Sequence, residues 1–364
     1  MFFIARATDP TFPGLFARTS TTRTRSRLIG ATDSVTGLCK KSSDGPELTR
    51  PGASPSVRRM TSPSAPNLRV DHVSIAVRSI NQALDFFLEY FPARLNEPER
   101  AGYGERPEFS WTDFTIGSFK IELIESARPA SFVERFLAKR GEGFHHLSFE
   151  IERLDLQLER LESDGVRIVD RFDEGDGHKT AFVHPRSAFG TLIQFWQQQE
   201  SAALEAPSAG GIVAKNGVRW QVDHLSLALE RVEPALAFFE RHFAGRLEVE
   251  PHLGYGESFR LLQMRLRDYR LELMEPARPE SFLSRFLARR GEGMHHLSID
   301  VEDLDAALAP LERAGAAIVD RFDFAPGRRT AFLHPRSAFG VLIQFWQVPG
   351  IQPVKTPKAP GGPA

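Results

Sequence analysis

Two stretches of this chain are near copies of each other, and no other feature of the sequence limits its possible folds as strongly. The first copy runs from Val70 (VDHVSIAV) to Gln197 (LIQFWQ), and the second runs from Val222 (VDHLSLAL) to Gln347 (LIQFWQ). Between these ends RFLAKRGEGFHHLS matches RFLARRGEGMHHLS, and TAFVHPRSAFG matches TAFLHPRSAFG. The repeat is much longer than the roughly 20–50 residues of a solenoid unit, so we expect a duplicated domain rather than an array.

The length of 364 residues fits two domains with flanking tails. Each copy is long enough to close a hydrophobic core of its own. The N-terminal stretch contains TSTTRTRSR and is rich in Ser, Thr, Pro and Arg, so it cannot bury enough apolar surface to fold alone. We therefore predict a disordered tail at 1–66, a first domain at 67–197, a linker at 198–219, a second domain at 220–348 and a disordered tail at 349–364.

Composition argues against several classes of partner. The formal net charge of −1 gives no electrostatic reason to expect nucleic acid or an acidic membrane surface. No apolar run approaches the roughly 20 residues that span a bilayer, and the single cysteine, Cys39, excludes a disulfide within the chain. We therefore expect a soluble protein in a reducing compartment, the cytoplasm. The alternative location is the mitochondrial matrix, if the segment before Met60 is a transit peptide rather than a passive or untranslated tail.

Each copy divides again into two halves of similar plan, a strand and a helix followed by further strands. Ser79 is expected to begin the first helix, with Gln82 at capping-box spacing. Alternation and turn residues predict the remaining elements of the first copy: strands at Val70–Val77, Glu108–Phe114, Phe119–Glu125, Phe144–Ile151, Val166–Asp170, Lys179–His184 and Thr191–Gln197, and helices after Pro129 and at Leu154–Ser163. This pattern predicts an α+β fold with a curved, mostly antiparallel sheet and helices on its outside.

Polar side chains recur at four strand positions of each copy. Eight of the eleven histidines fall in matched pairs, and two of these pairs are expected to face the same way on the opening strands of the halves. Together with a carboxylate and a carboxamide on the closing strands, they make a plausible octahedral site for a divalent ion, which the residues do not identify among Co, Mn, Zn, Ni and Fe. The alternative is a set of hydrogen-bonded core residues. The eight positions are His72, Glu122, His146, Gln194, His224, Glu272, His296 and Gln344.

Two further histidine pairs have other expected positions. His145 and His295 precede a ligand candidate on the same strand, so alternation predicts that they point to the opposite face and support the site or pack in the core. His184 and His334 begin the motif HPRSAFG, where a turn histidine and a substrate contact are both open.

The segments VDHVSIAV, FLAKRGEGFHHLSFEI and DRFDEGDGHKTAFVHPRSAFGTLIQFW, with their second-copy partners, resemble the methylmalonyl-CoA epimerase family of the vicinal-oxygen-chelate, or glyoxalase, superfamily. The resemblance implies paired βαβββ modules that form a cup around one divalent metal. This chain would then hold four modules in two cups, like an epimerase dimer fused into one polypeptide, as a monomer or a homodimer. The family's metal positions fall on the eight residues given above.

The sequence departs from the epimerase pattern at the last strand. That family carries a glutamate there, which binds metal and serves as a base, whereas both copies here have glutamine, Gln194 and Gln344. The carboxylate lies instead on the closing strand of the first module, at Glu122 and Glu272, which we predict to be both ligands and bases. Glu108 is a candidate counterpart of the family's partner base. The second copy reads SFRLLQ there, without an acid, so the first copy is the better candidate for epimerisation.

The resemblance implies an isomerase that removes a proton α to the carbonyl of a small thioester, with a metal ion polarising the carbonyl and a carboxylate taking the proton. The substrate would be a small molecule such as an acyl-CoA, whose phosphates Lys139, Arg140 and Arg186 could meet. One alternative is an Fe(II) dioxygenase of the extradiol or hydroxyphenylpyruvate type, in which His72, His146 and Glu122 form the facial triad. The other is a binding member of the superfamily that holds a ligand without chemistry.

Overall fold

The computed structural model describes residues 67–102, 107–175, 177–198, 211–267, 269–325 and 327–351, which belong to one compact unit. The N-terminal tail, Met60, Cys39, most of the predicted linker and the chain beyond Ile351 lie outside the described residues. Among the residues that are described, no helix is both long and apolar enough to cross a bilayer.

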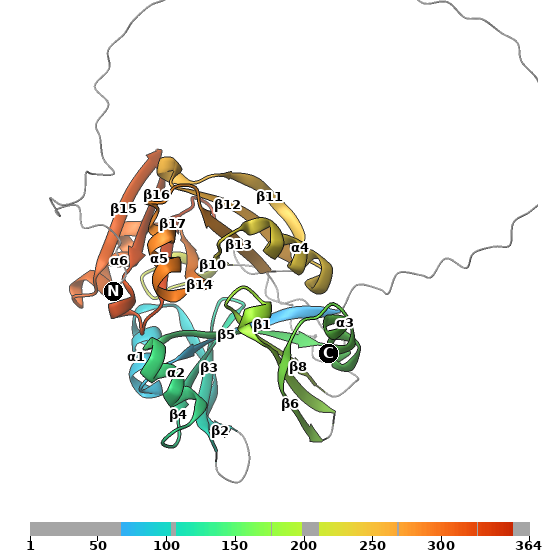
Figure 1. Ribbon diagram of the computed structural model, residues 1–364. Helices are drawn as coiled ribbons and strands as arrows, with labels where there is room; N and C mark the ends of the chain where they lie inside the picture. The colour runs from blue at the N-terminus through green and yellow to red at the C-terminus, as the bar shows by residue number, and fades with distance from the viewer. Residues whose placement is uncertain are drawn as a thin grey trace, which may run out of the picture. The chain divides into compact units, whose positions relative to one another are not determined.

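Each copy forms one curved sheet (Figure 1). The first sheet consists of β1 (Leu68–Ala76), β2 (Ala93–Gly102), β3 (Phe109–Ile116), β4 (Phe119–Ser126), β5 (Gly143–Ile151), β6 (Ile168–Gly175), β7 (His178–Val183) and β8 (Leu192–Gln197), in the order β2-β3-β4-β1-β5-β8-β7-β6. The two opening strands, β1 and β5, lie side by side at its centre and run antiparallel, and each pairs in parallel with the closing strand of its own module.

The second sheet repeats this order. Its strands are β10 (Arg219–Ala228), β11 (Arg246–Leu253), β12 (Phe259–Leu266), β13 (Tyr269–Pro276), β14 (Gly293–Val301), β15 (Ile318–Ala325), β16 (Arg328–Leu333) and β17 (Leu342–Gln347), and the short β9 (Ile212–Val213) pairs with β10. Both sheets are mostly antiparallel, so the predicted α+β class with four repeated modules is confirmed.

Six α-helices accompany the sheets in the described residues: α1 (Ile80–Tyr90), α2 (Phe132–Arg140), α3 (Leu154–Ser163), α4 (Val232–Phe243), α5 (Phe282–Arg290) and α6 (Leu304–Arg313). The predicted start of α1 is confirmed, because the Ser79 hydroxyl accepts a hydrogen bond from the Gln82 N–H. Gly141 ends α2 with a φ of 73°, a backbone conformation that glycine adopts without the cost of a Cβ.

The strand β2 is the main element that the sequence pattern does not predict. Its sequence, ARLNEPERAG, is polar and contains Pro98, and its register against β3 shifts twice. These features suit an edge strand, where one row of backbone groups faces solvent and charged residues and proline are tolerated. The equivalent strand β11 is also an edge strand with two register shifts, so a polar, bulged edge is a property of both copies.

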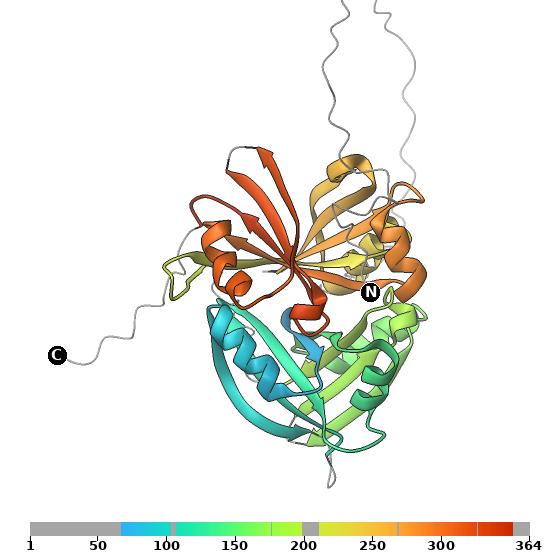
Figure 2. The ribbon, with the colours of Figure 1, turned by 90° about the vertical axis from the view of Figure 1, so that its left-hand side faces the viewer.

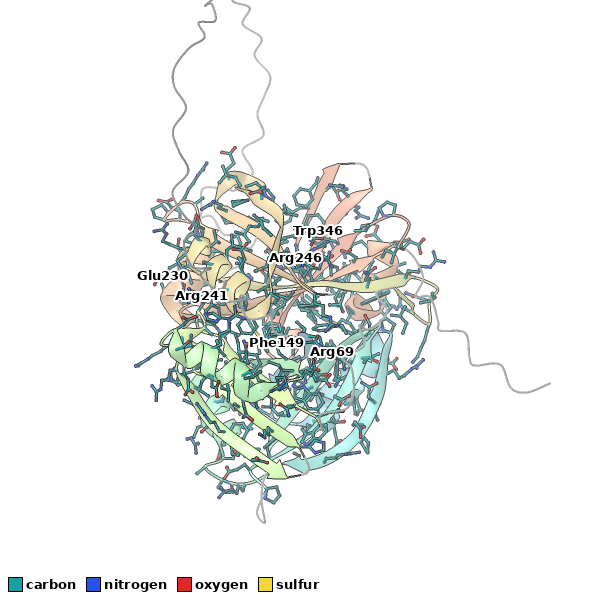
Figure 3. The ribbon with its side chains drawn as sticks, turned by 90° about the vertical axis from the view of Figure 1, so that its right-hand side faces the viewer. Arg69, Phe149, Glu230, Arg241, Arg246 and Trp346 are labelled. Atoms are coloured by element: carbon teal, nitrogen blue, oxygen red, sulfur yellow. The ribbon has the colours of Figure 1, made fainter. Side chains whose placement is uncertain are left out.

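The two copies lie against each other (Figure 2). Buried residues of both belong to one hydrophobic core. The rings of Phe149 on β5 and Phe243 on α4 lie 4.8 Å apart between centroids. Nearby, the carboxylate of Asp164 accepts a hydrogen bond of 2.7 Å from Nε of Arg241, and Figure 3 shows Arg241 and Phe149 where the copies meet. The amide of Gln157 also donates to the backbone carbonyl of His242 at 2.7 Å. The duplication therefore buries surface that either copy alone would expose.

The motif HPRSAFG serves this contact between the copies. His184 caps the turn, because its Nδ1 accepts a hydrogen bond of 3.0 Å from the backbone N–H of Arg186. This is the turn histidine that was one of the two expectations. Phe189 then packs against Phe238 of the other copy, and the next residue, Gly190, has a φ of 73°. A Cβ on Gly190 would lie 1.7 Å from the carbonyl oxygen of Glu292.

The second-copy motif makes the reciprocal contact. Phe339 packs against Phe86, and a Cβ on Gly340 would lie 1.8 Å from the carbonyl oxygen of Glu142. His334 caps its turn in the same way as its first-copy counterpart. Packing between the copies therefore gives the retained motif a structural role, and a substrate contact of His184 or His334 stays a prediction.

One cross-strand pair differs in charge between the copies. In the first copy Arg69, labelled in Figure 3, donates to the Glu150 carboxylate at 2.7 Å. The equivalent pair is Gln221 opposite Asp300, so the acid has no cross-strand cation. Burial, together with the charge of Asp223, raises the pKa of Asp300 to about 7.

We predict that Asp300 makes the stability of the protein depend on pH. Its folded-state pKa lies above the ordinary value of 3.8, so folding favours the protonated form of Asp300. Its contribution to the free energy of unfolding is therefore fully present below about pH 4. That contribution is lost as the pH rises through about 7. The loss is on the order of 2 kcal/mol after allowance for partial exposure. Thermal melts should show Asp300→Asn gaining several degrees over wild type at pH 8 and little at pH 4. Gln221→Arg, which copies the first-copy pair, should give the same gain; equal shifts at both pH values would contradict this.

Candidate metal centres

The opening strand of each module carries a β-bulge directly before its histidine. In β1 the extra residue is Asp71, and in β5 it is His145. A bulge interrupts the alternation of side chains, so the extra residue lies beside its neighbour instead of on the opposite face. The prediction that His145 points away from His146 is therefore wrong. The second copy repeats both bulges, before His224 and before His296.

The bulge at Asp71 fixes the orientation of His72. The Nδ1 of His72 donates to the Asp71 carboxylate at 2.7 Å, and the Lys120 ammonium holds that carboxylate at 3.0 Å. With the proton on Nδ1, the Nε2 atom of His72 presents its lone pair. A carboxylate behind a histidine in this way is the usual support of a metal-binding imidazole.

The bulge at His145 does the same for His146. The two Nδ1 atoms lie 2.9 Å apart, so one ring donates to the other and Nε2 of His146 faces away from the contact. The ring of His145 also packs edge-on against Phe136 of α2, with centroids 4.9 Å apart. Its burial lowers the pKa of His145 to about 4, so this imidazole is neutral at physiological pH. His145 therefore supports the ligand candidate His146, which is one of the two roles predicted for it.

The predicted ligands of the first copy converge at the centre of the sheet. The Nε2 atoms of His72 and His146 are 3.2 Å apart, and Oε2 of Glu122 lies 3.6 Å from each. Oε1 of Gln194 lies 3.1 Å from Nε2 of His146. The Glu122 oxygen is buried and has no hydrogen-bond partner among the described residues. A buried carboxylate oxygen of this kind needs a cation or water, so the residues present fit a divalent ion.

The second copy brings the equivalent residues together. Oε1 of Glu272 lies 3.6 Å from Nε2 of His224 and 3.8 Å from Nε2 of His296. Both Nε2 atoms are buried and without a hydrogen-bond partner in the described part of the chain. Gln344 is buried beside His296, and Asp223 accepts the Nδ1 proton of His224 at 2.6 Å. Each copy therefore contains a group of two histidines and a glutamate that could hold an ion.

We call the surroundings of the candidate ligands in each copy the first and the second cup. The two cups differ at one residue that was not predicted from the sequence. Asp113 on β3 lies directly opposite Glu122 in the antiparallel ladder, so both carboxylates face the same side of the sheet. Asp113 is buried, and its Oδ1 accepts a hydrogen bond of 2.7 Å from Asn96. The equivalent position opposite Glu272 is Gln263. The sequence offered one signal for this residue: an acid stands at this strand position in the first copy, and a glutamine stands there in the second.

This difference changes the chemistry of the two glutamates. Burial raises the pKa of Glu122, and the charges of Asp71 and Asp113 add to that rise against the opposing charge of His72. Burial alone would also raise the pKa of Glu272, but the charge and hydrogen bond of His224 outweigh it and lower that pKa to about 2. Among the protein's own groups, the surroundings of Glu122 therefore favour its protonated form, and those of Glu272 favour its ionised form.

The remaining predicted site residues are not brought to the cluster. Glu108 lies just before β3 and forms an ion pair with Arg128, roughly 16 Å along the strand from Asp113. Arg140 ends α2 and lines a cavity between the copies. Arg186 lies in the turn that His184 caps. The roles of these residues toward a substrate remain predictions.

Comparison with known proteins agrees with the duplication. The model of the Glyoxalase/Bleomycin resistance protein/Dioxygenase superfamily matches residues 71–182 and again residues 223–332. The uncharacterized protein YqjC of Bacillus subtilis is 36% identical over 128 residues, which cover 35% of this chain and 89% of that protein. The mitochondrial methylmalonyl-CoA epimerase of Dictyostelium discoideum is 28% identical over 130 residues, covering 35% of this chain and 76% of the epimerase.

One solved structure matches both copies together. A mutant of 4-hydroxymandelate synthase from Streptomyces coelicolor covers 80% of this chain and 94% of its own, with a TM-score of 0.54. The sequence identity is 15%, so this similarity concerns the fold. A single chain with two such domains is therefore an arrangement that occurs elsewhere.

Proposed function

The chain belongs to the Glyoxalase/Bleomycin resistance protein/Dioxygenase superfamily, and from this membership we propose that it is a divalent-metal-dependent enzyme that removes a proton α to the carbonyl of a small thioester. The proposed substrate class is an acyl-CoA, as the resemblance of each copy to methylmalonyl-CoA epimerases suggests. The first cup is the proposed site of the reaction. The second cup is proposed to bind an ion of its own.

The observation that carries this proposal is the convergence of two imidazole nitrogens on one buried carboxylate oxygen. In the first cup Nε2 of His72 and Nε2 of His146 each lie 3.6 Å from Oε2 of Glu122. These residues, with Gln194, would hold the ion. A bound divalent ion would supply Lewis acidity for the carbonyl oxygen of the substrate.

The protein's own residues supply the proton transfer. Glu122 takes the α-proton through a carboxylate oxygen, and burial favours this because it raises the pKa of that group. Asp113 faces the same side of the sheet and disfavours a second negative charge nearby, so it helps Glu122 to accept the proton. Asn96 holds Asp113 in place through its amide. The hydrophobic sheet beneath, with Ile121 and Leu123 fully buried, excludes water from one side of the cup.

The same step is less favourable in the second cup. Gln263 replaces the second carboxylate, and its amide lies 3.4 Å from Glu272 as a donor. The Ser226 hydroxyl also donates to Glu272, at 2.9 Å. Both donors stabilise the ionised carboxylate and make it a weaker base. The second cup therefore suits ion binding better than proton abstraction.

A deuterium wash-in assay tests the proposal. Metal-loaded protein is incubated with methylmalonyl-CoA in deuterated water, and incorporation at the α-carbon is followed by mass spectrometry. Asp113→Asn should slow incorporation by about tenfold or more if the proposed pair of carboxylates operates, whereas Gln263→Asn in the second cup should leave the rate within about twofold. Equal effects of the two changes would contradict the assignment to the first cup.

A second candidate function is an Fe(II) dioxygenase, because two histidines and one carboxylate also form the facial triad of that class. In this case His72, His146 and Glu122 would hold the iron. Oxygen uptake separates the two functions: the epimerase-like reaction consumes none. If Fe(II)-loaded protein consumes oxygen and exchanges no proton of any acyl-CoA tested, the dioxygenase is the better account.

A further inference from the structure

A cavity of about 160 Å³ lies between the two copies, outside the ligand clusters. Its walls come in equivalent pairs from the two domains: Phe136 and Phe286, Arg140 and Arg290, His145 and His295. Because equivalent residues face each other, the cavity lies on the approximate two-fold axis that relates the copies. The retained turns close it, since Gly190 and Gly340 lie against the backbone of the opposite domain.

The two arginines give the cavity its charge. Arg140 and Arg290 are the last residues of α2 and α5, and both line the cavity. Burial lowers the pKa of Arg290, and the nearby charge of Arg140 lowers it further, so the two guanidinium groups repel each other. A protein can offset such repulsion by binding an anion between the two groups.

Two imidazoles also line the cavity, those of His145 and His295. The Nδ1 atom of each lies 2.9 Å from Nδ1 of the residue that follows it, so this contact uses Nδ1 and not Nε2. The one acid in the wall, Glu292, accepts the backbone N–H of Glu230 at 2.9 Å and is held by that contact.

We propose that this cavity is a binding site for one small oxyanion of phosphate size, held between the guanidinium groups of Arg140 and Arg290. The guanidinium groups of the two arginines in its wall carry only hydrogen-bond donors, and their forks match the geometry of phosphate oxygens. One anion per chain contacts both domains, so it stabilises their association. The site is separate from the two cups, although His145 and His295 contact a ligand candidate of each.

Titration calorimetry of the full chain with inorganic phosphate, at constant ionic strength set by chloride, tests the site. We expect one phosphate per chain and an upward shift in melting temperature with phosphate concentration. Arg140→Gln or Arg290→Gln should weaken binding at least about tenfold. Lys139→Gln is the matched control, because it removes the same charge from a neighbouring residue that does not line the cavity, and should change binding by less than about twofold.

Three results would overturn the proposal. Two phosphates per chain, lost on chelation of metal, would place the anion in the cups. If Lys139→Gln weakened phosphate binding as much as the arginine changes, the effect would be one of diffuse charge. If phosphate showed no saturable binding below roughly 10 mM, there would be no site. Melting curves without phosphate separate loss of the site from misfolding, and Arg290→Lys, which keeps the charge, should retain part of the affinity.

Discussion

Replacing Glu122 by glutamine should lower the rate of α-proton exchange by at least about a hundredfold while the first cup still binds its ion. Glutamine has the size of glutamate and keeps a carbonyl oxygen that can ligate, but it cannot accept the proton. Deuterium incorporation into methylmalonyl-CoA measures the rate, and elemental analysis of the same sample counts the metal. Glu272→Gln is the matched change in the second cup and should alter the rate by less than about twofold, because the first cup does the exchange.

The double change Glu122→Gln with Gln194→Glu tests the position of the base. It moves the carboxylate to the closing strand of the second module, where the epimerase family carries it, and keeps the composition of the ligand set. We expect it to recover exchange lost in the single variant. A single variant that exchanges at the wild-type rate would show that Glu122 is not the base.

The two candidate metal centres should differ sharply in their importance for activity. His146→Ala removes a ligand from the first cup and should reduce exchange by about a hundredfold or more, because it removes both the ion and its support of the carbonyl. His296→Ala empties the second cup and should leave exchange within about twofold of wild type. Rates are compared under saturating metal, and circular dichroism checks that both variants fold.

The opposite ranking would contradict the account of the cups. Suppose that His296→Ala abolished exchange and His146→Ala did not. The base would then be Glu272, beside Gln263, in spite of the low pKa of that carboxyl. Equal loss in both variants would show that the cups work together.

Much of the fold and the convergence of the candidate ligands could be predicted from the sequence because the duplication repeats each signal. A histidine in an apolar strand is ambiguous alone, but His72 and His224 lie at matched positions with matched partners. Alternation placed Glu122 on the same face as His72, and the structure brings the two side chains to 3.6 Å. The end of α3 at Ser163 was also predicted, since Gly165 follows it.

The features that were not predicted from the sequence have local physical causes. Alternation failed at His145, because a bulge inserts one residue into β5 and turns that ring toward His146. The strand β2 was missed because an edge strand needs few apolar residues. Asp113 reaches the cup only through its cross-strand register, which depends on the length of the β3–β4 turn. The cavity with Arg140 and Arg290 depends on how the copies pack, which no single segment encodes.

The most direct test of the central claim is a metal titration of the chelated wild-type protein at neutral pH. The converging ligands of both copies predict two divalent ions per chain, each with a Kd below about 1 μM. The variants His146→Ala and His296→Ala should each bind one divalent ion per chain. If the wild-type chain binds no ion more tightly than roughly micromolar, the clusters are not metal sites, and a cup that holds a ligand without metal chemistry becomes the better description.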